Sequence, residues 1–385
     1  MIRFGEREKN QFLINPRWPD DEKKVLVELK SEFEKRSGAH GYFFIASSGS
    51  SRRAGESAKL VVLSQRSVLN SALRVSQYLN ATAEDAWGLV LPEYHVAGLG
   101  VRARAHLAGA PVHQQEWEIF KFLSFLDTNK IAFVSLVPTQ ISDIVQAQLR
   151  CPASLKQVFV GAATLTQELK NKARSLGWPI AETYGMTETC SMIAVKNEEE
   201  FFRPLPGVQL RVQSTLEIQC DSILTAILQM SGKQFSMEYF EHEAWYKTQD
   251  LAEVTIRSGE QRLKLLGRSD DFIKVLGEGV SLAELRDHLH SAARVLKLSE
   301  SKFDLVALVD ERAGHRLVVV TEGLDTAQVQ SLLDAYNQQR RPYEKIKLTV
   351  ALPSLPRTEL GKLKVEEVKS TIEAKLKKGS HGEYQ

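Results

Sequence analysis

Short apolar runs alternate with amphipathic segments along most of the chain. Runs of four to seven residues, the length of buried strands, occur at Gly41–Ser47, Trp87–Pro92, Phe133–Pro138 and Gln157–Ala163. Between them, residues 67–79 repeat apolar side chains on one helical face, at Val68, Leu69, Ala72, Leu73 and Leu79. Thr166 is suited to cap a helix that stops at Gly177. Strands that alternate with helices predict a layered, mostly parallel α/β sheet.

The pattern changes in the second half of the chain. Short strands and turns from Leu216 to Ile256 indicate a small β-rich subdomain, placed at about 205–268 within an N-terminal domain of 1–268. Beyond a break at 267–270, Ser281 and Glu284 form a capping box that begins a helix. Two strand-like runs and a second helix follow. We therefore predict a mobile α+β C-terminal domain over 269–385, with a frayed tail from Lys375 onward.

Composition narrows the class of protein. The chain has 385 residues, 43% of them hydrophobic, which is enough for two domains with their own cores. A net charge of +2 gives no reason to expect a nucleic-acid partner. The three cysteines form no C-x-x-C pair, and no apolar run approaches the roughly 20 residues that span a bilayer. The expected protein is soluble and cytoplasmic, with no membrane span.

Several segments carry candidate chemistry. The loop Ser47–Val61 combines serines, glycines and Lys59, which suits phosphate binding but equally suits a polar surface loop. His95 follows a strand, at the edge where α/β sheets bind ligands. Glu188 in the loop Glu182–Thr189 could supply one carboxylate to Mg²⁺. Asp250 is a candidate ribose ligand, and Lys362 lies on a turn near the C-terminus.

Each segment is weak alone, but their order along the chain is specific. YGMTET at Tyr184–Thr189, the box at Trp245–Asp250, the segment at Leu265–Leu285 and PRTELGK at Pro356–Lys362 together resemble the adenylate-forming superfamily of acyl-CoA synthetases, luciferases and peptide-synthetase adenylation domains. The resemblance runs from about Ser47 to Lys364. Within the superfamily, YHVAGLGVRARAHLAGA, SLVPTQ, RPLPG and LGEGV are most similar to the o-succinylbenzoyl-CoA synthetase subfamily.

The resemblance implies a role for each matching position. It implies nucleotide binding by Ser47, Ser48, Gly49, Ser50, Ser51, Lys59, Gly161, Ala162, Ala163, Tyr184, Gly185, Asp250, Arg268 and Lys274. Catalytic roles fall to His95, Thr187, Glu188 and Lys362, with Glu188 also holding Mg²⁺. The acid would contact His95, Arg104, Gly185 and Met186. Asp270 would be a hinge, and Gly277, Glu278 and Gly279 would border a channel for the thiol.

These roles imply a two-step reaction. Two anions meet when a carboxylate attacks the α-phosphate of ATP, so catalysis consists mainly of charge neutralisation and positioning. Rotation of the C-terminal domain would then exchange Lys362 for the thiol channel and let coenzyme A take the acyl group. The implied ligands are ATP, Mg²⁺, coenzyme A and a carboxylic acid, with o-succinylbenzoate as the expected acid. If so, Arg104 is our choice for its second carboxylate.

Two departures from the family pattern keep alternatives open. The phosphate loop begins near residue 47, so the first subdomain is shortened and a second subunit is one way to cover its edge. Gly49 and Lys59 lie ten positions apart, roughly four more than is usual in the family. The alternatives are a ligase for another aryl or acyl acid, an enzyme that loads a carrier protein, and a degenerate nucleotide-binding relative without catalysis.

Overall fold

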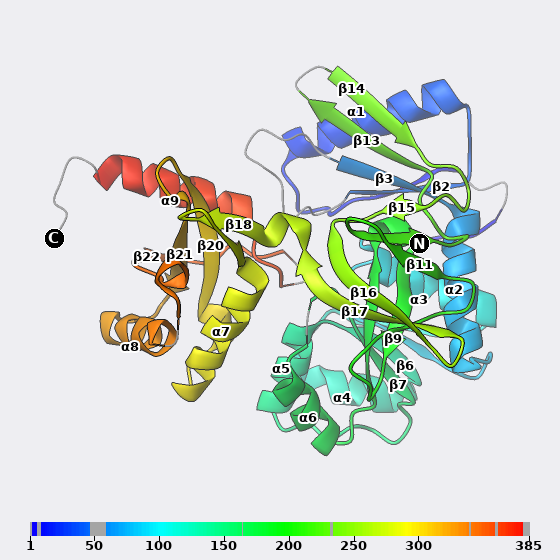
Figure 1. Cartoon of the computed structure of the whole chain (residues 1–385). Coiled ribbons are helices and arrows are strands. Elements are labelled where there is room, and N and C mark those ends of the chain that lie inside the picture. Colours follow the sequence, from blue (N-terminus) through cyan, green and yellow to red (C-terminus); the bar gives the residue numbers. More distant parts are fainter. Residues whose placement is uncertain are drawn as a thin grey trace. The chain divides into compact units, whose positions relative to one another are not determined.

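Two compact units make up the chain in the computed structural model (Figure 1). Unit 1 comprises Met1–Ser48, Ser57–Thr248 and Ala252–Leu265, and unit 2 comprises Gly49–Glu56, Gln249–Leu251 and Leu266–Gln385. The structure describes residues 2–5, 9–46, 59–163, 165–231, 234–338, 340–358 and 361–379. The five phosphate-loop residues predicted at 47–51 lie outside this range. The predicted boundary at residue 268 stays a prediction.

A seven-stranded sheet forms the centre of unit 1. Its order is β10-β9-β8-β7-β6-β4-β5, and neighbouring strands among the last five are parallel. The strands are β4 (Trp87–Leu89), β5 (Val112–Gln114), β6 (Phe133–Leu136), β7 (Gln157–Val160), β8 (Ile180–Met186), β9 (Ser191–Lys196) and β10 (Arg203–Pro204). Strands β9 and β10 run antiparallel at one edge. The predicted layered, mostly parallel α/β class is thereby confirmed.

The second sheet of unit 1 is mostly antiparallel, in the order β1-β2-β3-β13-β14. Its strands are β1 (Gln11–Leu13), β2 (Tyr42–Ala46), β3 (Lys59–Ser64), β13 (Ala226–Ser231) and β14 (Gln234–Tyr239). The apolar run at Gly41–Ser47 therefore does not join the parallel sheet. Its strand β2 pairs antiparallel with β3, with Phe43 opposite Leu63. An apolar run identifies a buried strand but carries no information on its neighbours.

Helices cover both faces of both sheets. They are α1 (Asp20–Ser37), α2 (Gln65–Leu79), α3 (Val96–Ala108), α4 (Ile119–Thr128), α5 (Pro138–Gln146) and α6 (Gln167–Ser175). Successive side chains of a strand point to opposite faces of the sheet, so they pack into different hydrophobic cores. Phe133 and Phe159 pack toward α2 and α3, whereas Val134, Val158 and Val160 pack toward α4–α6. Helices α2 and α3 thus lie between the two sheets, with α1 on the far face of the second sheet.

The buried face of α2 differs from the predicted one. Leu73 is 46% exposed, whereas Ser71 and Arg74 are buried. The reason is hydrogen bonding. Ser71 donates to the Cys190 carbonyl (2.8 Å), and Arg74 donates to the Ser222 hydroxyl (3.1 Å). Between two sheets, a helix buries polar side chains that find partners, and a count of apolar residues does not detect this.

Smaller β elements follow the parallel sheet. A three-stranded sheet contains β11 (Gln209–Val212), β12 (Leu216–Gln219) and β15 (Tyr246–Lys247), and a two-stranded ribbon contains β16 (Asp250–Arg257) and β17 (Glu260–Arg268). Both fall in the region expected to be β-rich. The hairpin β13–β14 comes from the same stretch of chain but completes the five-stranded sheet instead.

Unit 2 packs helices on both faces of a five-stranded sheet. The strands are β18 (Phe272–Val275), β19 (Glu278–Ser281), β20 (Phe303–Asp310), β21 (Gly314–Glu322) and β22 (Leu348–Leu352). The helices are α7 (Leu282–Val295), α8 (Thr326–Asn337) and α9 (Val365–Gly379). Cores form between the sheet and α7–α8 and between the sheet and α9. Ser281 caps α7 as predicted, with its hydroxyl accepting from the Glu284 amide (3.3 Å).

The predicted frayed tail is wrong over residues 375–379. Helix α9 continues to Gly379, and its residues Val368 and Ile372 are fully buried against the sheet. Residues beyond 379 lie outside the described range.

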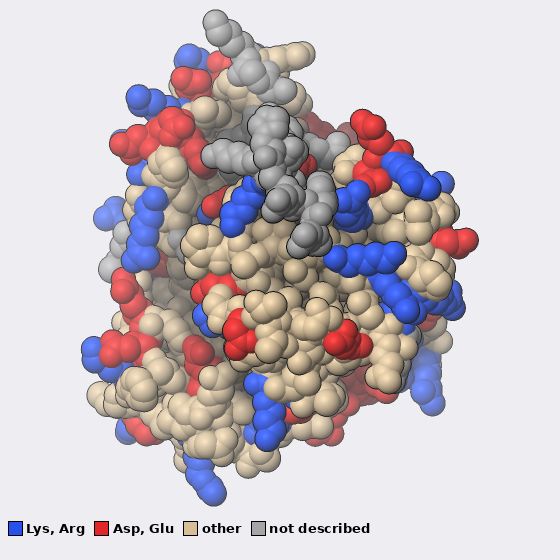
Figure 2. All heavy atoms as spheres, turned by 90° about the vertical axis from the view of Figure 1, so that its left-hand side faces the viewer, with Lys and Arg blue, Asp and Glu red and all other residues tan. Residues whose placement is uncertain are grey.

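Charged side chains of both signs occur together on the surface. On the face shown in Figure 2, Lys and Arg side chains are interspersed with Asp and Glu among the described residues. None of the helices described is both long enough and apolar enough to cross a bilayer.

Candidate active site

The carboxyl ends of the parallel strands gather several of the predicted site residues in unit 1. His95 follows β4, Gly161–Ala163 follow β7, and Thr187 and Glu188 follow β8. Parallel strands end at the same edge of a sheet, which is where open α/β sheets bind ligands. The structure therefore places these residues at the carboxyl ends of the parallel strands of the seven-stranded sheet.

The turn from β8 to β9 is held by hydrogen bonds of the Thr189 side chain to the backbone. The pairing of the two strands shifts register between Tyr184 and Gly185. The Thr189 hydroxyl accepts from the Met186 amide (3.1 Å) and donates to the Ser191 carbonyl (2.9 Å). Cys190 (φ 55°) and Ser191 (φ 99°) adopt left-handed conformations. Strained, cross-linked turns of this kind are common where side chains must be fixed for function, and this one carries Thr187 and Glu188.

Gly185 is required by a close backbone approach. A Cβ at this position would lie 2.6 Å from the Met192 Cα and closer still to the Ser191 carbonyl oxygen. We expect Gly185→Ala to destabilise unit 1 by about 3 kcal/mol, the upper part of the usual overpacking range, because backbone atoms cannot rotate away. Urea unfolding followed by tryptophan fluorescence measures this, since all five tryptophans belong to unit 1. An unchanged midpoint would contradict the described crossing.

Lys59 and Glu188 form an ion pair. The Lys59 Nζ lies 2.7 Å from Glu188 Oε1, and the two residues are 129 positions apart in the sequence. Both side chains are largely buried, with 28% and 13% of their surface exposed. Lys59 thus lies at the carboxylate predicted to hold Mg²⁺. The serines predicted to accompany it lie outside the described residues.

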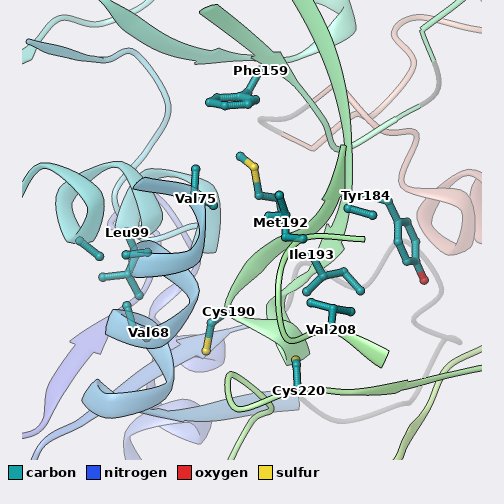
Figure 3. Packing of buried hydrophobic residues seen from close by; sticks show 14 of the residues in the cluster. Val68, Val75, Leu99, Phe159, Tyr184, Cys190, Met192, Ile193, Val208 and Cys220 are labelled. Carbon is teal, nitrogen blue, oxygen red and sulfur yellow. The ribbon is translucent and has the colours of Figure 1, made fainter. Parts of the chain in front are cut away.

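The predicted adenine-binding positions lie on neighbouring strands. Gly161 follows β7, and a Cβ there would lie 2.7 Å from the Thr183 hydroxyl on β8. Tyr184 lies at the margin of the main core, with its hydroxyl directed away from the other labelled side chains (Figure 3). Its ring is 6.3 Å from that of Phe202. Ala162 and Ala163 are exposed, whereas Tyr184 is buried, with 8% of its surface exposed.

An ion-pair cluster beneath β8 escaped sequence reasoning. Lys170 Nζ lies 2.8 Å from Glu182 Oε1, and Lys196 Nζ lies 3.0 Å from Glu182 Oε2. Lys170 also donates to the Asn197 carbonyl (2.6 Å). Lys170 and Glu182 are buried. The cluster supports the strand that carries the site residues, and neither periodicity nor motif spacing indicates that these three charges meet.

Two predicted acid-binding residues lie on or beside α3. His95 is the residue before the helix, and its ring is 4.9 Å from that of Tyr94. Arg104, on the third turn, is only 1% exposed. Its Nη2 donates to the Ser191 hydroxyl (3.3 Å), and its guanidinium lies 5.7 Å from the Trp87 ring centre. Its Nε and Nη1 atoms have no partner among the described residues.

Burial dominates the electrostatics of Arg104. Desolvation lowers the pKa of the guanidinium to about 10, well below its ordinary value. No carboxylate in the described part of the chain forms an ion pair with it. Ser191, which sequence reasoning missed, is its hydrogen-bond partner, and the left-handed backbone of Ser191 offers no sequence signal. Helix α3 thus carries a buried cation that retains unused donors.

Unit 2 holds the remaining predicted residues. Asp250 and Arg268 pair, with Arg268 Nη1 3.4 Å from Asp250 Oδ1. Lys362 is exposed as a residue, but crowding around its ammonium lowers its pKa by desolvation, Arg268 lowers it further and Asp250 opposes both. The structure therefore brings Lys362 within electrostatic range of the pair predicted to bind ribose.

The predicted hinge and thiol-channel residues flank β18. Asp270 lies in a short 3-10 helix (Ser269–Asp271). Leu276 (φ 53°) and Gly277 (φ 88°) form the two-residue turn between β18 and β19, the type in which both residues need positive φ. Lys274, Glu278 and Gly279 are exposed on this hairpin. No observation assigns a role to these residues, and their roles stay predictions.

Comparison with known proteins identifies the family. The sequence profile of AMP-binding enzymes matches residues 19–220, just over half of the chain. The chain belongs to the AMP-binding enzyme family. Among curated relatives, it is 24% identical over 326 residues to the 2-succinylbenzoate–CoA ligase of Bacillus subtilis, covering 80% of this chain and 65% of the relative. It is 29% identical over 268 residues to that of Escherichia coli, covering 69% and 55%.

Solved structures share the fold. The o-succinylbenzoate CoA synthetase of Bacillus subtilis in complex with its acyl-adenylate intermediate gives a TM-score of 0.76 at 18% identity, covering 94% of this chain and 83% of that one. The same enzyme in complex with ATP and magnesium ion gives 0.67 at 20% identity, covering 85% and 69%. The chain spans 65% and 62% of the length of the first two curated relatives.

Proposed function

We propose that the protein is an ATP-dependent acid–CoA ligase that adenylates an acid carrying a second carboxylate, with o-succinylbenzoate as the substrate. The fold, the family and the names of the relatives support the class of reaction. The observation that carries the choice of acid is the buried guanidinium of Arg104. The proposed cosubstrates are ATP and coenzyme A, with Mg²⁺ as the metal and the cytoplasm as the compartment.

Arg104 supports a dianionic acid on energetic grounds. A buried charge without a counter-ion costs several kcal/mol, so it persists where a ligand supplies the missing charge. The Nε and Nη1 donors, which have no partner among the described residues, could each donate to an anionic group. The carboxylate that reacts must meet the α-phosphate, so a second one is available for Arg104. An acid with a single carboxylate would leave the guanidinium unpaired.

The residues of unit 1 suit the nucleotide and its metal. Mg²⁺ bound to phosphates takes only one or two protein carboxylates, and Glu188 at the end of β8 fits that requirement. Bound there, Mg²⁺ would neutralise phosphate charge. Lys59 would then move from Glu188 to the departing phosphates. Its long, flexible side chain allows this movement. Tyr184 and Gly161–Ala163 would receive the adenine.

The residues of unit 2 suit first the adenylation step and then the thioester-forming step. Asp250 would accept hydrogen bonds from the ribose hydroxyls, with Arg268 holding the carboxylate in place. Lys362 would neutralise the attacking carboxylate and the α-phosphate, where two anions meet. Movement about Asp270 would then withdraw Lys362 and bring Gly277, Glu278 and Gly279 to the thiol.

The test is CoA-dependent release of pyrophosphate from ATP with Mg²⁺. We expect turnover with o-succinylbenzoate and little with benzoate or a medium-chain fatty acid. Equal turnover with benzoate would remove the assignment of Arg104 while retaining the reaction class. A carrier-protein loader would release pyrophosphate but form no thioester with free CoA. Silence of the folded protein with every acid would favour the non-catalytic alternative.

Glu188→Gln tests the metal role. The amide keeps the shape but removes the charge, so we expect the Mg²⁺ concentration for half-maximal adenylation to rise at least about tenfold, the usual size for metal-site changes. The matched control is Glu217→Gln, because Glu217 is also mostly buried and pairs with Arg211 (2.7 Å) within the three-stranded sheet. An unchanged Mg²⁺ dependence in Glu188→Gln, or an equal change in the control, would contradict the role.

A further inference from the structure

A network of four charges crosses unit 2 from the hinge segment to the loop that carries Lys362. Arg286 on α7 lies between two carboxylates. Its Nη1 is 3.2 Å from Asp271 Oδ1, and its Nε is 3.5 Å from Asp304 Oδ1. The Nε also donates to the Leu305 carbonyl (3.1 Å). Asp271 is the residue after the proposed hinge Asp270, so α7 and β20 hold the hinge segment through one guanidinium.

The other oxygen of Asp304 continues the network. Arg357 Nη2 lies 3.7 Å from Asp304 Oδ2, and Arg357 Nη1 donates to the Gly361 carbonyl (3.1 Å). Arg357 also forms a β-bridge with Leu363, which is buried. These contacts close a turn on which Lys362 is exposed. Asp304 therefore has one arginine reaching toward the hinge segment and another reaching toward the lysine loop.

The network restrains the positions of the groups that it joins. Two arginines and two aspartates balance in charge, and their side chains are 13–26% exposed. An isolated surface pair contributes little, but a partly buried network with forked arginine geometry constrains the groups it joins. Helix α7 and strand β20 pack in the same core, so the intermediate anchors are fixed.

We propose that Arg286 and Arg357 are positioning residues that make the hinge segment and the Lys362 loop move as one body. This inference rests on the proposed function, in which Lys362 serves adenylation and movement occurs about Asp270. When the loop is held at a fixed position relative to the hinge segment, Lys362 reaches the same position each time the domain adopts its adenylation orientation. Without Arg286 and Arg357, the lysine reaches that position in only a fraction of these movements.

The first test needs no substrate. Hydrogen exchange should report on the Ser269 amide, bonded to the Gln249 carbonyl, and on the Gly361, Lys362 and Lys364 amides, bonded to Thr358 and Pro356. We expect Arg286→Ala to speed exchange at both places, although Arg286 does not touch the loop. Asp304→Asn, which keeps the side-chain shape, should do the same. Arg316→Ala is the matched control, because it removes the Arg316–Asp310 pair (2.5 Å) of the same sheet. Acceleration confined to Ser269 in Arg286→Ala would overturn the proposal.

The second test is a double-mutant cycle on single-turnover adenylation. We expect Arg286→Ala and Arg357→Ala each to slow it about tenfold, and the double variant to be far less than 100-fold slower, because coupled residues are not additive. Thioester formation from a supplied adenylate should change little. Additive losses, or equal loss in both half-reactions, would overturn the proposal. Absence of turnover in the unmutated protein would instead refute the proposed function. The hydrogen-exchange result does not depend on turnover and would still test the coupling of the two segments.

Discussion

Lys362→Ala is expected to slow adenylate formation about 100- to 1000-fold, the usual cost of losing one group that stabilises developing charge. Thioester formation from a supplied acyl-adenylate should stay nearly unchanged, because the proposed movement about Asp270 withdraws the lysine before that step. Rapid-quench measurement of each half-reaction separates the two. This contrast follows from the proposed role and would not arise from a general loss of folding.

The structure supports that role through the turn that carries the residue. The Thr358 amide donates to the Lys362 carbonyl (2.7 Å), and the Lys362 amide donates to the Thr358 hydroxyl (3.1 Å). With its backbone held in this way, Lys362 presents a side chain that no ion pair occupies among the described residues. A charge without a fixed partner is available for an anionic ligand.

Lys364→Ala is the matched control for this experiment. Lys364 is exposed, lies two residues further on and pairs with Glu367 within the same helix region (3.4 Å). We expect both half-reactions to survive its loss. Equal loss of the two half-reactions in Lys362→Ala, or a comparable loss of adenylation in Lys364→Ala, would contradict the role of Lys362.

Local patterns predicted the fold where they depend on near neighbours. The Thr166 cap and the Ser281 cap require only that a hydroxyl face the third amide of its own helix, and both are present. The partner of β2 and the buried face of α2 depend on segments far along the chain. Ser71, for example, is buried because the Cys190 carbonyl is there to accept its hydrogen bond. No pattern within α2 contains that information.

The same division applies to the candidate site. Spacing along the chain placed Thr187 and Glu188 after a strand, and the structure has them there. The pairing of Glu188 with Lys59 and of Arg104 with Ser191 joins residues 129 and 87 positions apart. Motif order suggested that these residues belong to one site, but only the fold shows which side chain meets which. The Lys170–Glu182–Lys196 cluster had no motif and was therefore missed.

Arg104→Met is expected to stabilise the protein and to remove its activity toward o-succinylbenzoate. Burial that lowers the pKa of Arg104 to about 10 corresponds to a cost on the order of 3 kcal/mol. Since the folded-state pKa lies below that of the unfolded chain, the cost is present in full below a pH of about 10 and is relieved only as the pH rises above it. Methionine fills a similar volume beside Trp87 without the charge, so urea unfolding followed by tryptophan fluorescence should shift to higher urea.

Activity should move in the opposite direction to stability. Loss of a buried partner for a carboxylate costs a few kcal/mol, so we expect turnover of o-succinylbenzoate to fall about 100-fold. Any turnover of benzoate should fall much less, since benzoate has no second carboxylate. Arg102→Met is the matched control, because Arg102 lies on the same helix and already pairs with Glu93. It should retain activity and gain no stability. An Arg104→Met protein that is less stable, or that turns over o-succinylbenzoate unchanged, would show that the guanidinium serves the fold and not the acid.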